Sequence, residues 1–318
     1  MTTSESELTP AATQTISTHA TTRARRPKVS FKGNWWRHLV ACVAIVVALF
    51  PVVFVASSAF NRDNTLQGAT VIPAHVTLHN FGNLLHNNVA TTSGGKADAP
   101  YLNWIVNSML IAGATAILAT LLGAFAAYAF SRFRFKGRRM GMVTLLLIQI
   151  FPQFAAIAAI YLLVLNIGDI FGPLGLNSLL AVVIVYLGGA LGVQAWLMKG
   201  FFDTIPQELD ESARVDGATP AQIFWGVVLP LATPVLIVVA LISFIFTFNE
   251  YVIASALLQT NDHFTLPVGM RGLISDQYGK AWGPFTAGAL MAAIPVTALF
   301  LFLQKWIIGG LTAGSVKG

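Results

Sequence analysis

Long runs of apolar residues, separated by short polar segments, dominate the pattern along this chain. Each run holds roughly 20 residues, which is the length that an α-helix needs to cross a hydrocarbon core about 30 Å thick. Helices are expected because backbone N–H and C=O groups find no water partner in lipid. The pattern therefore predicts an all-α membrane protein with six transmembrane helices, at about 38–60, 105–130, 140–164, 178–198, 231–251 and 284–306.

The composition and the distribution of charge agree with this topology. Hydrophobic residues make up 55% of the chain and charged residues only 10%, whereas soluble proteins carry about 25% charged residues. Of the 19 Lys and Arg residues, all but Arg62, Lys96, Arg271 and Lys280 fall on the side of the predicted membrane that holds the N-terminus. Since Lys and Arg concentrate in cytoplasmic loops, both termini are expected to be cytoplasmic. The net charge of +6 then reflects topology and does not indicate a nucleic-acid partner.

The first 36 residues differ from the rest of the chain. They are rich in Thr, Ser and Ala and end in a basic cluster, and we interpret them as a disordered basic cytoplasmic tail. They lack the order of regions that a cleavable signal peptide has. Residues 37–318 are predicted to form one six-helix transmembrane domain.

A polar segment, residues 199–230, separates the fourth and fifth predicted spans. Thr204 and Thr219 each begin a capping-box pattern, and Gly217 between them fits a helix C-terminus, so two short helices with a hinge are predicted. The segment is acidic, which is unfavourable beside an anionic leaflet. It is therefore either a helix that docks on another protein or a solvated loop that joins two membrane helices.

Motifs for catalysis are missing. The chain has no H-E-x-x-H and no G-x-S-x-G pattern, and Gly94-Gly95-Lys96 lacks the rest of a P-loop, so neither a metal site, an active site nor ATP binding is expected here. Few polar side chains lie at membrane depth: Gln149, Gln153, Gln194, Asn249 and Glu250, of which Gln149, Gln153, Asn249 and Glu250 are the candidates for a substrate path. Such side chains either bond neighbouring helices or line a substrate path.

The segment 199–230 resembles the E-A-A-x-x-x-G-x9-I-x-L-P loop of the membrane subunits of ATP-binding-cassette (ABC) importers. Ser212 replaces the first Ala of that motif and Val227 replaces its Ile. The matching positions are Glu211, Ser212, Ala213, Gly217, Val227, Leu229 and Pro230. The strings "NWIVNSMLIA" and "AAYAFSRFRFKGRR" extend the resemblance over most of 100–318 to sugar importers, and "GGLTAGSVKG" is similar to the ending of MalG-type subunits of maltose transporters.

This resemblance implies a type I ABC importer permease fold and import of maltose, maltodextrin or a related α-glucoside. The loop would couple the chain to a separate ATPase through Glu211, Ser212, Ala213, Gly217, Leu229 and Pro230. The chain itself would be no enzyme and would bind no cofactor, because ATP and Mg belong to the ATPase subunits.

The partners that the resemblance implies are a MalF-type permease, two ATPase subunits, an extracytoplasmic sugar-binding protein and the lipid bilayer of a bacterial cytoplasmic membrane. The external loop before the last span would contact the binding protein, with Tyr278 and Trp282 as candidate residues.

Three other functions compete with a sugar importer. An ABC importer for a non-sugar solute shares the loop and differs only in its solute. A stand-alone secondary carrier predicts charged coupling groups within the spans, and a membrane enzyme predicts a catalytic constellation, neither of which the sequence contains.

Overall fold

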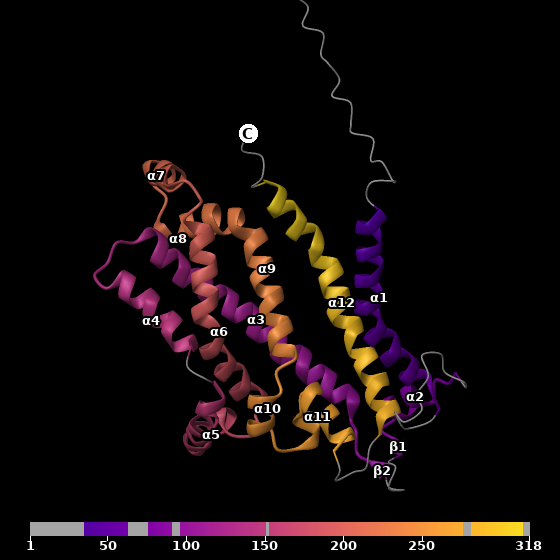
Figure 1. Ribbon diagram of the computed structural model, residues 1–318. Coiled ribbons are helices and arrows are strands. Elements are labelled where there is room, and N and C mark those ends of the chain that lie inside the picture. The colour runs from indigo at the N-terminus through magenta and orange to yellow at the C-terminus, as the bar shows by residue number, and fades with distance from the viewer. Residues whose placement is uncertain (1–34, 63–75, 91–95, 151–152, 276–280, 314–318) are drawn as a thin grey trace, which may run out of the picture. The chain divides into compact units, whose positions relative to one another are not determined.

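The computed structural model describes residues 35–62, 76–90, 96–150, 153–275 and 281–313, without the side chains of 153–154 and 307–313. The described residues are mostly helical (Figure 1). The α-helices are α1 Trp35–Phe60, α2 His79–Leu85, α3 Tyr101–Arg132, α4 Arg138–Ile150, α5 Gln153–Ile170, α6 Leu179–Phe202, α7 Gln207–Val215, α8 Pro220–Ile223, α9 Leu229–Phe248, α10 Val252–Leu257, α11 Leu266–Leu273 and α12 Trp282–Ala313. Strands β1 Val89–Ala90 and β2 Lys96–Ala97 pair antiparallel, two 3-10 turns are η2 Gly172–Leu174 and η4 Asn261–His263, and η3 Phe224–Val228 is a π-helical turn.

The all-α membrane fold is confirmed. Among the described residues, five helical segments are long and apolar enough to cross a membrane: α1, α3, α6, α12 and the continuous helix that α8, η3 and α9 form over Pro220–Phe248. The predicted span at 140–164 differs from a straight helix, because α4 and α5 occupy it and are bent by 102° relative to each other. Pro152, which has no backbone N–H to continue a helix, lies between them in the sequence, outside the described residues.

Helix α3 packs against both α6 and α9, and small residues allow these close approaches. A Cβ added at Gly123 of α3 would stand 3.1 Å from Gln194 Cβ of α6, and one at Gly192 of α6 would stand 2.6 Å from the carbonyl oxygen of Leu145 in α4. Small residues at such crossings are the usual way in which membrane helices gain packing energy, since lipid gives no hydrophobic drive between them.

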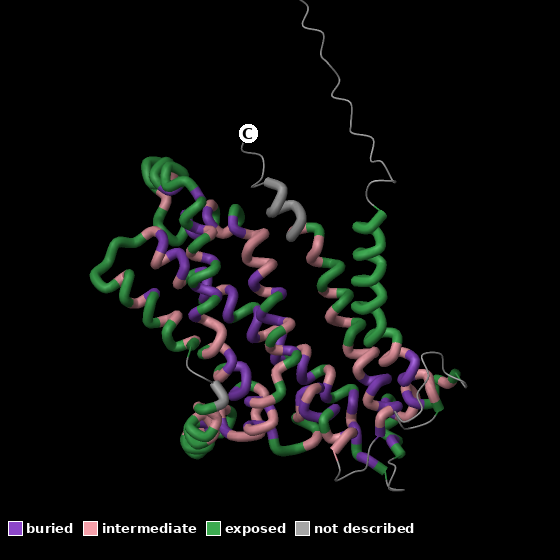
Figure 2. The backbone as a smooth tube through the Cα atoms, viewed as in Figure 1, coloured by how far each residue is buried: buried purple, intermediate pink, exposed green. Residues whose placement is uncertain are grey.

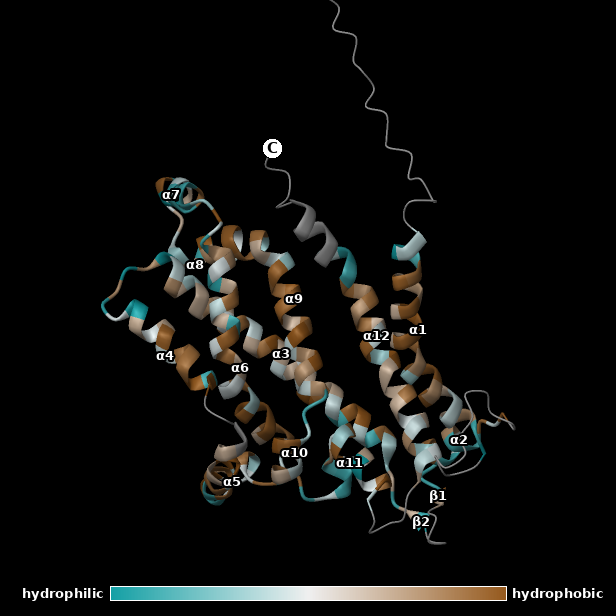
Figure 3. Ribbon diagram, in the orientation of Figure 1, coloured by the Kyte–Doolittle hydropathy of each residue, from teal (hydrophilic) through white to brown (hydrophobic). Residues whose placement is uncertain are grey.

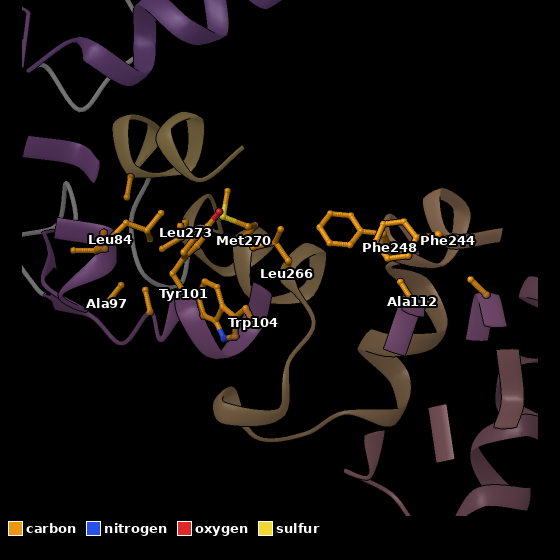
Figure 4. Close-up of a cluster of buried hydrophobic side chains, with 14 residues drawn as sticks. Leu84, Ala97, Tyr101, Trp104, Ala112, Phe244, Phe248, Leu266, Met270 and Leu273 are labelled. Carbon is orange, nitrogen blue, oxygen red and sulfur yellow. The ribbon is translucent and has the colours of Figure 1, made fainter. Parts of the chain in front are cut away.

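The two ends of the helical unit that begins at Phe50 carry different short elements (Figure 1). Helices α7 and α8 lie at the end where α3 finishes, while α10 and α11 lie at the opposite end. There Trp104 Nε1 of α3 donates a 2.8 Å hydrogen bond to the Asn261 carbonyl oxygen. A Cβ at Gly269 of α11 would come within 2.1 Å of the Trp104 indole, so only glycine allows this contact. Figure 4 shows Trp104 in the buried cluster that joins α3 to α11.

The helix surfaces are strongly apolar (Figure 3), as lipid contact requires. The described residues before Phe50, which are 35–49, belong to a separate unit, and all of them are exposed. In the rest of the chain burial concentrates on facing sides of α3, α6 and α9, whereas α7 is largely exposed (Figure 2).

Candidate functional site

The segment 199–230 forms two short helices around a glycine. The backbone φ of Gly217 is +85°, a left-handed conformation that glycine adopts without a steric penalty. The capping box of the second helix is also confirmed: Thr219 Oγ1 accepts from the Gln222 N–H, and the Gln222 side chain accepts from the Thr219 N–H.

The start of the first helix was predicted wrongly. Helix α7 begins at Gln207 with Pro206 before it and with no side-chain cap. Thr204 Oγ1 instead donates a 2.7 Å hydrogen bond to the carbonyl oxygen of Phe201, at the end of α6. The extended backbone of Pro206 separates that turn from α7, so Thr204 lies too early to cap it.

A buried ion pair holds α7 against the end of α3. Arg132 Nε lies 2.8 Å from Asp210 Oδ2, and the two side chains are only 2% and 3% exposed. Arg132 Nη2 also donates a 3.0 Å hydrogen bond to the Ile205 carbonyl oxygen just before α7. The last residue of a membrane-spanning helix thus contacts α7 and the turn that leads into it.

Further bonds attach the rest of the segment to α3. Ser131 Oγ donates a 2.7 Å hydrogen bond to Asp203 Oδ1, and Lys199 pairs with the other oxygen of that carboxylate. Partial burial raises the pKa of Asp203, but the hydrogen bonds from Lys199 and Ser131 outweigh it and hold this pKa below its ordinary value. Tyr128 O–H donates to the Pro220 carbonyl oxygen at 3.3 Å, at the start of the second helix.

The outward face of α7 combines acidic and apolar residues. Glu211 and Ser212 are exposed, and Ser212 Oγ donates to the Glu208 carbonyl oxygen within the helix. Val215 on this face is 88% exposed. Ala213 faces inward, half-buried against a cluster that contains Phe202 and Ile223, and Leu209, one turn before it, is 42% exposed.

The remaining motif residues lie where the segment enters the membrane. Leu229 is half-buried, and Pro230 is exposed in the first turn of α9. The structure therefore separates the six predicted coupling residues into an α7 group, the Gly217 hinge and the start of α9.

Two of the four predicted path residues meet in one cavity. This cavity, of about 430 Å³, lies between α4, α6 and α9, and Gln149 and Glu250 both line it. Asn249 lines a different cavity, of about 530 Å³, and its Nδ2 donates back to the Ile245 carbonyl oxygen. The side chain of Gln153 lies outside the described residues.

Glu250 has a structural role in this cavity. Its carboxylate accepts the Tyr186 hydroxyl and the backbone N–H groups of Ile253 and Ala254, at 2.8 and 3.1 Å. Gln149 Nε2 donates a 2.5 Å hydrogen bond to the Gly189 carbonyl oxygen, which joins α4 to α6.

Of the two aromatic residues predicted to contact a binding protein, the structure describes one. Tyr278 lies outside the described residues. Trp282 is half-buried at the start of α12, with its ring edge-on to Phe285 at 5.9 Å between centroids.

Sequence reasoning missed the ion pair of Arg132 with Asp210 and the bond of Ser131 to Asp203. The basic run from 131 to 139 and the acids of 203–216 were visible in the sequence. Their opposite charge was the only signal, because the two segments are far apart along the chain and neither has a local pattern that names its partner.

The sequence of this chain matches a known family of membrane proteins. The model of the family described as "Binding-protein-dependent transport system inner membrane component" matches residues 119–311, which include the C-terminal part of α3, all of α4 to α11 and most of α12. The chain belongs to this family. It is thus a membrane component of a transport system, and the matched region holds the whole of segment 199–230.

Relatives and solved structures agree with the family. The chain is 39% identical to the galactooligosaccharides transport system permease protein GanQ of Bacillus subtilis, over 88% of this chain and 94% of that one. It is 37% identical to the maltose/maltodextrin transport system permease protein MalG of Vibrio parahaemolyticus, over 89% and 96%. A bacterial ABC transporter that imports the acidic polysaccharide alginate superposes with a TM-score of 0.70, at 22% identity over 88% of this chain and 99% of that chain, which shows that the fold is that of an ABC importer permease.

Proposed function

We propose that this permease is one subunit of an ATP-driven importer for maltose, maltodextrin or a related α-glucoside. The observation that carries the proposal is the similarity, at 37% identity over nearly the full length, to a maltose/maltodextrin permease. A galactooligosaccharide is the second candidate solute, because GanQ is similar to the same degree. The two candidates share a chemistry: both are short, neutral chains of hexoses.

The proposed coupling surface consists of Glu211 and Val215, which lie one turn apart on the outward face of α7. Exposed apolar side chains beside carboxylates suit docking into a cleft of a partner protein that offers apolar and basic groups. Ala213 would set how closely α7 packs on this chain, and Gly217 would set the angle of the hinge. With α7 fixed to α3 through Asp210, a displacement of the partner would move the membrane helices as a rigid body.

The other partners follow from the same proposal. A second permease of the MalF type would complete the translocation path, and two ATPase subunits would bind and hydrolyse ATP with Mg, so this chain needs no cofactor of its own. An extracytoplasmic sugar-binding protein would deliver the solute, with the segment around Tyr278 and Trp282 as its contact. The complex would reside in a bacterial cytoplasmic membrane, with residues 1–36 and the C-terminus in the cytoplasm.

Sugar-stimulated ATP hydrolysis in proteoliposomes tests the proposal. The complete complex is assayed with binding protein that carries maltose, maltotriose or a galactooligosaccharide. Stimulation by the α-glucosides is the expected result. Stimulation by the galactooligosaccharide alone selects the second candidate, and stimulation by neither class, with an unrelated solute active, contradicts both.

A further inference from the structure

The cavity between α4, α6 and α9 contains polar side chains that the fold leaves without hydrogen-bond partners. Gln194 and Ser243 line it and are only 6% and 7% exposed, and Thr247 lies one helical turn beyond Ser243 on α9. Within the described part of the chain, Gln194 Oε1 has no hydrogen-bond partner, and the two hydroxyl groups make no bond either. The two hydroxyl groups therefore have unused donors and acceptors at this space, and Gln194 beside them has an unpaired oxygen that is buried toward Gly123 of α3.

Some helical hydroxyl groups of this protein bond locally: Thr233 Oγ1 donates to the Leu229 carbonyl oxygen at 3.3 Å, and Thr286 Oγ1 donates to that of Trp282 at 2.9 Å. This local bond is the usual solution for Ser and Thr in a membrane helix. Thr115 and Thr120 of α3 have no partner within the described chain and are buried between helices. Ser243 and Thr247 differ from both groups, because they make no local bond and line a cavity, so their hydroxyl groups are available to an occupant with hydroxyl-like donors and acceptors.

Gln149, Tyr186 and Glu250 also line the cavity and are hydrogen-bonded within the protein, whereas the remaining lining residues are apolar and include Phe246. Phe246 is 76% exposed, and Val193 and Ile242 are each 43% exposed beside it. A hexose has a rim of hydroxyl groups and a face of C–H groups, so it matches a wall that is polar on one side and aromatic or aliphatic on the other. The volume of about 430 Å³ lies in the range of small-molecule sites.

The charge at the cavity favours a neutral occupant. Glu250 lines it, and its carboxylate already accepts from Tyr186 and from two backbone N–H groups. No Lys, Arg or His lies among the described residues that line the cavity, so an anionic solute would find no basic partner there.

We propose that this cavity is a sugar subsite, in which Gln194, Ser243 and Thr247 hydrogen-bond to the hydroxyl groups of one hexose unit of a neutral oligosaccharide in transit. Phe246 packs against the C–H face of the same ring. The inference rests on the proposed function and deepens it, since it places part of the solute path on this chain.

Thiol protection tests the subsite directly. Cys42 is the single cysteine, so Cys42→Ser gives a background into which Thr247→Cys is introduced as a reporter. Thr233→Cys is the matched control, because it lies on the same helix and does not line the cavity. The complete complex in nanodiscs, with and without a non-hydrolysable ATP analogue, is labelled with a hydrophilic methanethiosulfonate reagent at increasing maltotriose or galactooligosaccharide.

Sugar is expected to slow labelling at position 247 and to leave position 233 unchanged. Adding Gln194→Leu to the reporter should raise the half-protective sugar concentration about fivefold, which corresponds to one lost neutral hydrogen bond. Labelling at 247 that no sugar slows overturns the subsite. A reporter that reacts in the isolated chain and not in the complex also overturns it, because the partner permease then fills the cavity.

The same samples separate this inference from the proposed function. ATP hydrolysis stimulated by sugar-loaded binding protein is measured on the cysteine-free complex. If ATPase is stimulated and protection is absent, the subsite is wrong and the importer stands. If no sugar stimulates ATPase, the proposed function fails, and protection by the same sugars still decides whether the cavity binds a hexose.

Discussion

The ion pair between Arg132 and Asp210 is the contact whose removal has the largest expected effect on coupling. Both side chains are almost fully buried, so Asp210→Asn leaves the Arg132 guanidinium without a counter-charge in a poorly hydrated site. Breaking a buried pair from one side typically costs about 3–5 kcal/mol. Asp203→Asn is the matched control: it neutralises a carboxylate in the same segment, but its pair with Lys199 is 23% and 42% exposed, where about 0–1 kcal/mol is expected.

We expect Asp210→Asn to release α7 locally and to leave the membrane helices folded. Hydrogen exchange followed by mass spectrometry measures this in the assembled complex, at the amides of residues 204–218. A loss of about 3 kcal/mol corresponds to roughly 100-fold faster exchange there, with little change in α3. ATPase stimulation by the loaded binding protein should fall with it, while Asp203→Asn remains close to the parent protein.

A double variant identifies the cause. Arg132→Met with Asp210→Leu removes both charges and keeps apolar contact, a change that is often neutral or stabilising for buried pairs. Recovery of slow exchange and of coupling would show that the unpaired charge was the defect. If Asp210→Asn exchanges at the same rate as Asp203→Asn and couples normally, the pair does not hold α7 and the reasoning is refuted.

Three smaller perturbations test other parts of the segment. Gly217→Ala places a side chain at φ +85° and should destabilise the local fold by about 1 kcal/mol, whereas Gly226→Ala, where a Cβ meets open space, should be tolerated. Equal sugar-stimulated ATP hydrolysis in the two variants would contradict a hinge at Gly217. Thr219→Ala removes the capping box and should cost about 1 kcal/mol, measured as faster amide exchange at the start of α8; unchanged exchange would contradict it. For Asp203, whose folded pKa is lowered, the stabilisation is present above its unfolded pKa of about 3.9 and is lost as the pH falls through the folded value. The difference in melting temperature between the parent and Asp203→Asn should therefore be constant near neutral pH and shrink below about pH 4, and a constant difference down to pH 3 would contradict the assignment.

Local and long-range features were not equally predictable from the sequence. The long apolar runs predicted the membrane helices because the bilayer demands a minimum length, and Thr219 with Gln222 predicted a helix start because a capping box spans only four residues. Thr204 satisfied the same pattern and does not cap α7, because the carbonyl oxygen of Phe201 offered its hydroxyl a partner in the preceding turn. Hydropathy alone also could not locate the bend between α4 and α5, since both are apolar.

The sequence predicted individual residues of the candidate site but not the contacts between its segments. The motif located Glu211 and Gly217, but the pairing of Asp210 with Arg132 depends on how α6 returns the chain to the end of α3, and no local pattern encodes that. The cavity is a similar case. Gln149, Gln194 and Glu250 were recognisable from the sequence as polar residues at membrane depth, but only the structure brings them to one cavity. Ser243 and Thr247 were not recognised, because their importance depends on hydrogen bonds that they do not make.

Helix α3 connects α7, the proposed coupling helix, to the proposed sugar subsite. Its last residue, Arg132, pairs with Asp210 of α7, and two to three turns earlier Gly123 packs closely against Gln194 of α6. A close-packed contact of this kind transmits displacement because it cannot absorb it. Under the proposal, motion imposed on α7 would reach the wall of the cavity through α3 and the contact of Gly123 with Gln194. Gln194, which contacts Gly123, also has a side-chain oxygen without a hydrogen-bond partner within the described chain. The side chain that would receive the motion from α3 is therefore also one of those proposed to bind the sugar.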